Sequence, residues 1–345
     1  MKTAKFQWLQ VMRGIAAIWV VLYHANNLNG VFLRPLEHPF FVQNGYLGVD
    51  FFFILSGFII ASSSHAMMER GDGFKAYALA RAIRIYVPYL PIGAGIFLLY
   101  LALPSVSAAP RDIGVLSTFT LLPTDLPPAL NVAWTLVHEI VFYGIFSLIF
   151  ISRRLLWSVL ACWGAVILGV RLSGHQMTVF ESYFLSAQNL DFLLGVAIFY
   201  VGRDRMTARA ATFAAGIGLA VVLAAAMSDA PNRVAVSLGF GLLVAAAASP
   251  SGARLPAWRF PLSLGSASYA IYLAHNPVLS VTARAIRFFD PALNPWLAVL
   301  AMSLVAILFG IAYWWHFERR ALAAVRLALE PSRAGLRIPA APLAG

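Results

Sequence analysis

The first apolar segment of the chain, about residues 6–26, carries two ionisable side chains, Arg13 and His24. An ionisable group at the centre of a membrane helix costs about 2.5–3.5 kcal/mol, so each needs a reason to be there. They are eleven positions apart, and at 100° per residue this separation returns the two side chains to one helical face, about 16 Å apart along the axis. A cation and a titratable base at that spacing suit a long, anionic cofactor. The alternative is that Arg13 extends to the interface and His24 is a packing residue.

The same face holds only small side chains between Arg13 and His24. They are Ala16, Ala17 and Val20. Small side chains leave a shallow groove on a helix, and we therefore expect an extended cofactor arm to lie along this face.

Three carboxylates are expected at the depth of His24. Asp50 begins the second apolar segment, Glu139 lies one turn into the fourth, and Asp191 lies in the sixth. A carboxylate beside a histidine can hold the ring in one tautomer and support its action as a general base. Asp50 and Asp191 are close to expected helix starts, where a negative charge is favoured for another reason. Glu139 is deeper, and the capping alternative does not account for it.

Two arginines three positions apart, Arg81 and Arg84, precede the third apolar segment. At that spacing they share one helical face, and two guanidinium groups together could clamp a phosphate. They could equally be ordinary cytoplasmic anchors of a membrane helix. A further histidine, His275, stands before the Asn276-Pro277 break, where it could line a cavity or bond freed backbone.

No metal site is expected. His138 begins the sequence HEIVF, but position 142 is Phe, so the second histidine of a zinc-protease motif is missing. The single cysteine, Cys162, excludes both an intramolecular disulfide framework and a thiolate cluster.

The elements that must position these residues are membrane helices. Of the 345 residues, 61% are hydrophobic and only 11% are charged, whereas soluble domains carry about 25% charged residues. The sequence therefore predicts an all-α, polytopic membrane protein of about ten transmembrane helices, and it excludes a soluble enzyme. The apolar segments run roughly over 6–26, 45–61, 86–103, 131–151, 155–172, 183–200, 208–227, 234–248, 266–287 and 295–317. A shorter apolar stretch, 113–122, is expected at the interface, and a kink is expected at Pro277.

The cations give the orientation. The net charge of +11 would indicate a nucleic-acid partner in a soluble protein, but here 18 of the 25 Lys and Arg residues fall on one side of the predicted membrane. The positive-inside rule then places both termini in the cytoplasm, and we expect no nucleic acid as partner. Residues 1–320 form the expected membrane domain, and residues 321–345 form a basic cytoplasmic tail, which from Pro331 we expect to be mobile.

Five stretches occur in the order found in one known family. They are LQVMRGIAAIWVVLYHA, GYLGVDFFFILSGFII, ARAIRIYVPY, WTLVHEIVFY and SYAIYLAHNPV. Over about residues 8–318 the chain resembles the acyltransferase-3 family of integral membrane acyltransferases. Within it, the chain looks most like the exopolysaccharide O-acetyltransferases.

The resemblance implies transfer of an acyl group, usually acetyl, from cytoplasmic acyl-CoA to a carbohydrate hydroxyl. The family's Arg-x10-His pattern falls on Arg13 and His24, and its Arg-x-x-Arg pattern falls on Arg81 and Arg84. Its helix-four glutamate falls on Glu139.

On these grounds we predict a bacterial inner-membrane O-acyltransferase that acts on an exopolysaccharide, another surface glycan or a lipid-linked glycan. We expect His24, Glu139 and Asp50 to be catalytic. Arg13, Arg81 and Arg84 are expected to bind acetyl-CoA. His24 would act as general base, or would itself carry the acyl group. A transporter of an anionic or lipid-linked sugar is the alternative, although the chain lacks the paired, broken helices typical of inverted-repeat carriers.

Overall fold

The computed structural model describes residues 6–36, 40–103, 112–202 and 206–329. Its regular elements are all helices, which confirms the all-α prediction. The predicted tail from Pro331 lies outside the described residues. The chain divides into two compact units. Unit 1 contains the described parts of Met1–Phe58 and Leu194–His316, and unit 2 contains those of Ile59–Leu193 and Phe317–Ala341.

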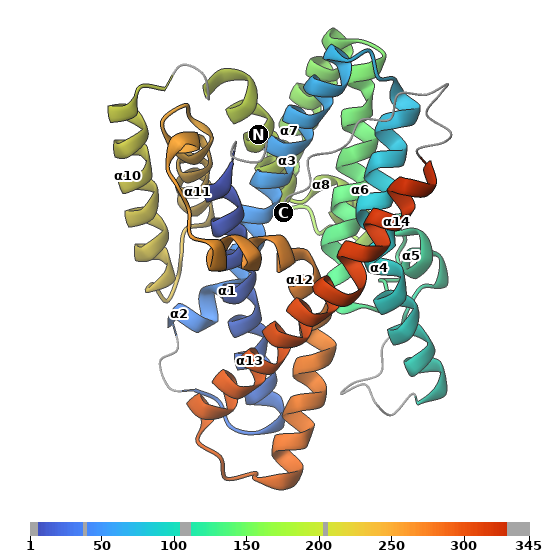
Figure 1. Cartoon of the computed structure of the whole chain (residues 1–345), viewed down its shortest axis with the longest axis vertical. Helices are drawn as coiled ribbons and strands as arrows, with labels where there is room; N and C mark the ends of the chain where they lie inside the picture. Colours follow the sequence, from blue (N-terminus) through green and yellow to red (C-terminus); the bar gives the residue numbers. More distant parts are fainter. Residues whose placement is uncertain (1–5, 37–39, 104–111, 203–205, 330–345) are drawn as a thin grey trace. The chain divides into compact units, whose positions relative to one another are not determined.

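Unit 1 is built from the two ends of the membrane domain (Figure 1). Its helices are α1 (Gln7–Phe32), α2 (Phe40–Gln43), the first half of α3 (Gly48–Glu69), the end of α9 (Gln188–Ala197), α10 (Ala208–Ala226), α11 (Arg233–Ala248), α12 (Arg259–Phe289) and α13 (Pro295–Tyr313).

Unit 2 contains the middle of the chain and its last described helix. Its helices are the second half of α3, α4 (Phe74–Ala102), α5 (Val115–Thr120), α6 (Trp134–Phe146), α7 (Arg153–Ser173), α8 (Val179–Leu185), the start of α9, and α14 (Arg319–Leu329).

Eight helical stretches of the described chain are long and apolar enough to cross a membrane. They are Gln7–Phe32, Phe40–Glu69, Phe74–Ala102, Asn131–Phe150, Arg153–Ser173, Val179–Val201, Ala208–Ala226 and Pro295–Leu329. The other two predicted segments are helical too: α11 has 16 residues, and α12 has 31 residues and continues through Pro277. The stretch 113–122 holds only the six-residue α5. The structure thus supports a multi-pass membrane protein.

Polar side chains at the helix ends explain where several of these helices begin. Ser152, Thr207, Asn232 and Asn294 accept hydrogen bonds from the first backbone N–H groups of α7, α10, α11 and α13. Each bond satisfies a donor that has no partner within its helix. Helix α7 ends at Gly174, whose φ of 69° is a conformation that glycine adopts without strain.

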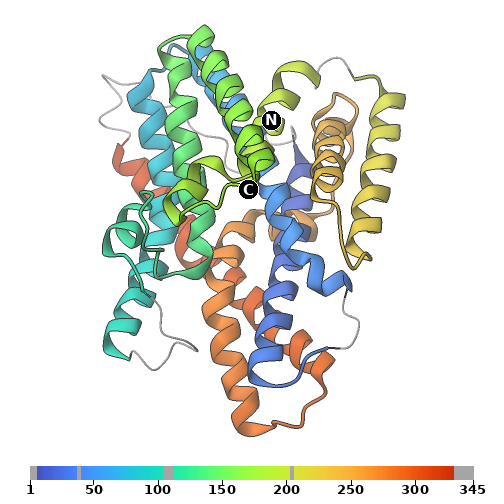
Figure 2. The ribbon, with the colours of Figure 1, turned by 180° about the vertical axis from the view of Figure 1, so that it is seen from behind.

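Helices α1 and α12 run parallel and in close contact within unit 1 (Figures 1 and 2). Gly14 lies against Gly265, and ten residues later on both helices His24 lies against His275. The glycines permit this approach, because a Cβ added to Gly265 would lie 2.0 Å from the carbonyl oxygen of Gln10. Small and aliphatic side chains of α1, α12 and α13 form the core beside this contact.

Gly265→Ala is expected to lower the thermal unfolding midpoint of the detergent-purified protein. The new Cβ would meet a backbone atom, which cannot rotate away, and overpacking of this kind costs about 1–3 kcal/mol. Gly30→Ala is the matched control on α1, because nothing described lies within 4 Å of that added Cβ. Its midpoint is expected to stay equal or rise. Equal midpoints for the two variants would contradict the close helix contact.

Candidate functional site

His24 is held in one orientation by its own helix. Its Nδ1 lies 3.0 Å from the carbonyl oxygen of Val20, one turn earlier. A carbonyl oxygen only accepts hydrogen bonds, so Nδ1 carries the hydrogen and the lone pair of the neutral ring is on Nε2. The side chain is half-buried. Its Nε2 is therefore suited to accept a proton.

A second histidine contacts His24 from α12. The ring centroids of His24 and His275 are 4.8 Å apart, with an edge-on angle of 67°. His275 is fully buried, and its Nδ1 lies 2.6 Å from the carbonyl oxygen of Tyr272. The sequence left the role of His275 open. Its only signal was a histidine next to a helix-breaking Asn-Pro pair.

Arg13 lies on the same uninterrupted helix as His24, as the sequence predicted. It is half-buried, and its Nη1 donates a hydrogen bond to Oε1 of Gln10 at 3.1 Å. Because α1 is continuous from Gln7 to Phe32, Arg13 and His24 share one face of this helix. Arg13 is only partly buried, so the structure is compatible with an anionic ligand at that end.

The groove expected between these two residues is not open, and that prediction was wrong. Ala16, Ala17 and Val20 are each at most 5% exposed. A Cβ added to Gly48 at the start of α3 would lie 2.9 Å from the carbonyl oxygen of Ala16 and 2.9 Å from a methyl group of Val20. The small side chains therefore serve close packing of helices, the usual role of such residues in membrane proteins.

Asp50 contacts an arginine rather than a histidine. Both its carboxylate oxygens accept hydrogen bonds from Arg233, with Nε to Oδ2 at 3.2 Å and Nη2 to Oδ1. The carboxylate is buried, and the arginine also lies over the ring of Tyr46 at 5.8 Å. Asp50 is in the first turn of α3. This is the position expected if its negative charge is favoured there by the start of the helix. We expected Asp50 or Glu139 to orient His24, but the contact that holds its Nδ1 is with the Val20 carbonyl.

In unit 2, Arg81 and Glu139 are linked through an aromatic side chain. The guanidinium of Arg81 lies over the rings of Tyr77 and Tyr143, at 5.5 and 5.6 Å, and donates to Ser63 at 2.5 Å. The hydroxyl of Tyr143 donates to the carboxylate of Glu139. These contacts fix both charged groups, and sequence reasoning did not identify the two tyrosines or the serine.

Arg84 lies one turn from Arg81 on the same face of α4. It pairs with Glu318, which is buried just before α14, at an N–O distance of 3.6 Å. The Arg84 side chain is 39% exposed. The ion pair holds the guanidinium beside Glu318, and the partly exposed side chain is compatible with an anion site.

His138 packs between the helices of unit 2. Its Nδ1 lies 3.0 Å from Oδ1 of Asn189, and its ring packs against Trp134 and Tyr183. The side chain is buried. These contacts pack α6 against α8 and the start of α9. Among the described residues, no group of three or more His, Cys, Asp or Glu side chains could hold a metal ion.

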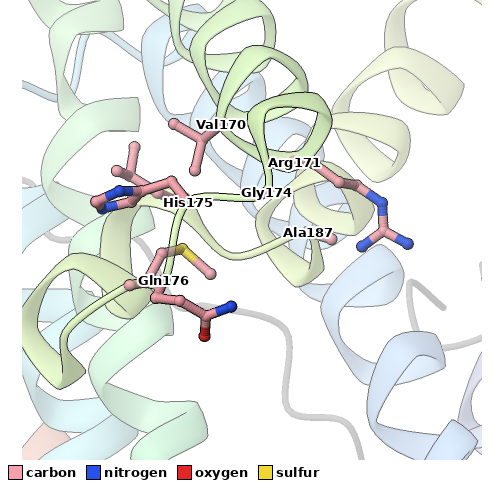
Figure 3. Close-up of a pocket in the computed structure, with 8 residues that line it drawn as sticks. Val170, Arg171, Gly174, His175, Gln176 and Ala187 are labelled. Atoms are coloured by element: carbon pink, nitrogen blue, oxygen red, sulfur yellow. The ribbon is translucent and has the colours of Figure 1, made fainter.

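A pocket lies at the end of α7 and in the loop that follows it (Figure 3). Its lining includes Arg171, His175 and Gln176, and His175 pairs with Glu181 at 3.3 Å. In Figure 3 the side chains of Arg171 and His175 extend in opposite directions. None of the predicted site residues lines this pocket, so it gives no support to any of their roles.

Known proteins resemble the chain along most of its length. Residues 6–315 match the family model described as an acyltransferase domain. The exopolysaccharide production protein ExoZ of Rhizobium meliloti (strain 1021) is 27% identical over 323 residues, which cover 87% of this chain and 93% of that protein. No solved structure matches the chain.

Proposed function

The chain belongs to the acyltransferase-3 family of membrane acyltransferases, and on that premise we propose that it transfers an acetyl group from cytoplasmic acetyl-CoA to a carbohydrate hydroxyl. The family makes the chain an O-acyltransferase. The donor, the acceptor and the residue roles are our proposal. The hydrogen bond from His24 Nδ1 to the Val20 carbonyl is the observation that carries it, because it leaves Nε2 free to act as a base.

The proposed reaction needs one base. His24 Nε2 takes the proton from the carbohydrate hydroxyl while the oxygen attacks the thioester carbonyl carbon. The carbon–sulfur bond then breaks, and the coenzyme A thiolate leaves and takes the proton from His24. The products are the ester and free coenzyme A, and His24 returns to its neutral form. In the covalent variant, the acetyl group rests on His24 before it reaches the hydroxyl.

We propose Arg81 and Arg84 as the groups that bind the coenzyme A phosphates. Two arginines on one face of α4, one stacked between tyrosines and one paired with Glu318, offer guanidinium groups whose direction is already fixed. Pre-ordered guanidinium groups lose little side-chain entropy when they bind an anion. Arg13, which is partly buried, is proposed as a further contact for this anionic donor.

Glu139 is proposed as a second catalytic residue. A carboxylate within a membrane helix is costly, and here the Tyr143 hydroxyl holds it in one orientation. Asp50 has weaker support, because Arg233 engages both its oxygens. We therefore keep Asp50 only as a candidate, to be separated by experiment from a structural ion pair.

We propose an exopolysaccharide or another surface glycan as the acceptor and the bacterial inner membrane as the location, with both termini in the cytoplasm. The similarity to a protein named for exopolysaccharide production supports this acceptor class.

The test is the O-acetyl content of surface and secreted polysaccharide in a deletion strain that carries either the wild-type gene or an empty vector. Loss of one ester signal, restored only by the gene, is expected. Unchanged esters in both strains would contradict a polysaccharide acceptor and would favour a small-molecule acceptor or a sugar transporter.

A further inference from the structure

The positive charge of Arg81 is held by uncharged partners. Its guanidinium carbon lies over the rings of Tyr77 and Tyr143, at 5.5 and 5.6 Å from their centroids. Its Nη2 donates a hydrogen bond of 2.5 Å to Oγ of Ser63, a residue of α3. In the described part of the chain, no carboxylate is among the hydrogen-bond or ring partners of Arg81. The group is therefore positioned without being neutralised by direct contact.

Arg84, three positions later on the same face of α4, is held in a different way. It forms an ion pair with Glu318 at an N–O distance of 3.6 Å, and that glutamate is buried. A carboxylate at this distance cancels much of the attraction that the arginine would exert on an incoming anion. The two arginines are therefore unequal. Arg81 keeps its charge for a ligand, whereas Arg84 shares its charge with Glu318.

The hydroxyl of Ser63 is directed by its own helix. Its Oγ lies 2.7 Å from the carbonyl oxygen of Ile59, one turn earlier on α3, and donates its hydrogen there. A serine hydroxyl has one hydrogen and two acceptor lone pairs. Because the hydrogen is used on the Ile59 carbonyl, the oxygen presents lone pairs to Arg81. Ser63 is thus a pre-directed, neutral acceptor for the guanidinium group.

Arg81 depends on this one hydrogen bond for its direction. Its Nε is buried and has no hydrogen-bond partner among the described residues. The ring faces of the two tyrosines attract the cation, but a contact of this kind does not select one N–H direction. The oxygen of Ser63 is therefore the contact that fixes how the guanidinium group points.

We propose that Ser63 is a positioning residue that orients Arg81 for the coenzyme A phosphates and leaves its charge uncancelled. This inference rests on the proposed role of Arg81 in donor binding. A phosphate group is negatively charged and accepts hydrogen bonds, so it binds best to a guanidinium group that is both pre-oriented and not neutralised. Arg81 is only partly buried, which is compatible with a ligand at this place.

The test is the dissociation constant for acetyl-CoA, measured by titration calorimetry on the detergent-purified full chain. Ser63→Ala removes the acceptor and is expected to raise the constant about 3- to 10-fold. Ser63→Thr keeps the hydroxyl and should bind like the wild type. Ser63→Asp supplies a stronger acceptor but cancels the charge, and it is expected to raise the constant about 10- to 100-fold. This order separates orientation from charge.

Ser64→Ala is the matched control. Ser64 is the next residue on α3, and its buried Oγ has no hydrogen-bond partner among the described residues. The same chemical change at this position should leave the dissociation constant at its wild-type value. In Ser63→Ala, kcat at saturating acetyl-CoA should also be unchanged, because the proposed role of Arg81 is to bind the donor and not to act on the reacting atoms.

Other results would overturn the proposal. Wild-type binding by Ser63→Ala would show that the serine oxygen is not needed, and equal weakening in the alanine and threonine variants would assign the effect to packing. Wild-type binding by a folded Ser63→Asp protein would show that neutralisation does not matter. Arg81→Lys separates the two levels of inference. If it alone weakens binding, only the role of Ser63 fails, whereas wild-type binding by Arg81→Lys would overturn the donor site as well.

Discussion

His24→Gln is expected to lower the rate of acetyl transfer by the purified protein about 10²- to 10⁴-fold, the usual contribution of a general base. Glutamine keeps a similar size and a donor that can contact the Val20 carbonyl, but it cannot take up a proton at neutral pH. The loss should lie in kcat, because His24 acts on the hydroxyl and not on the coenzyme A phosphates. The measurement is the initial rate of coenzyme A release in the presence of deletion-strain polysaccharide.

The controls separate catalysis from folding and from donor binding. His175→Gln, at an exposed histidine of unit 2, should leave the rate unchanged. In His24→Gln, the dissociation constant for acetyl-CoA should match the wild type. Arg81→Lys should do the opposite and weaken donor binding, since lysine replaces a flat, stacked guanidinium by a single ammonium group. A His24→Gln protein that is folded and fully active would contradict both the base and the covalent mechanism.

Hydropathy predicted the helices of this chain well, because membrane-spanning segments must be long, apolar and internally hydrogen-bonded. The ten predicted segments are all helical in the structure. Segment ends were less accurate. The predicted segment 86–103 corresponds to the later part of helix α4, which ends at Ala102 but already begins at Phe74. The helix extends beyond its apolar part to include Arg81 and Arg84.

Placement on one face of a single helix was also predictable. Arg13 and His24 share a face because α1 is uninterrupted from Gln7 to Phe32. The spacing of Arg81 and Arg84 similarly required only the helical period. Such relations are local, and they need no knowledge of which helices are neighbours.

Contacts between helices could not be predicted, because small residues indicate that a helix packs closely but not which helix it packs against or in which register. The partner of Asp50 is 183 positions away in the sequence. The contact between His24 and His275 depends on the register of two parallel helices. The groove prediction failed for the same reason: nothing in the sequence of α1 shows that Gly48 covers Ala16 and Val20.

Arg233→Met is expected to destabilise the folded protein by about 3 kcal/mol, because it leaves the carboxylate of Asp50 buried without a cation. Removing one partner of a buried ion pair costs about 3–5 kcal/mol, and the lower value applies because the Arg233 side chain is 43% exposed. The loss should appear as a lower unfolding midpoint in detergent. The double variant Asp50→Asn/Arg233→Met should recover most of the midpoint, since it removes the unpaired charge together with its partner.

The double variant also decides between the two roles of Asp50. If the ion pair is only structural, the stable Asp50→Asn/Arg233→Met protein should transfer acetyl groups at a rate close to the wild type. A protein that has recovered its midpoint but lost its activity would instead support the catalytic role predicted from the sequence. A single Arg233→Met variant as stable as the wild type would contradict the ion pair itself. In that case the carboxylate would have to be neutral or hydrated, because an isolated charge in that position cannot remain buried without cost.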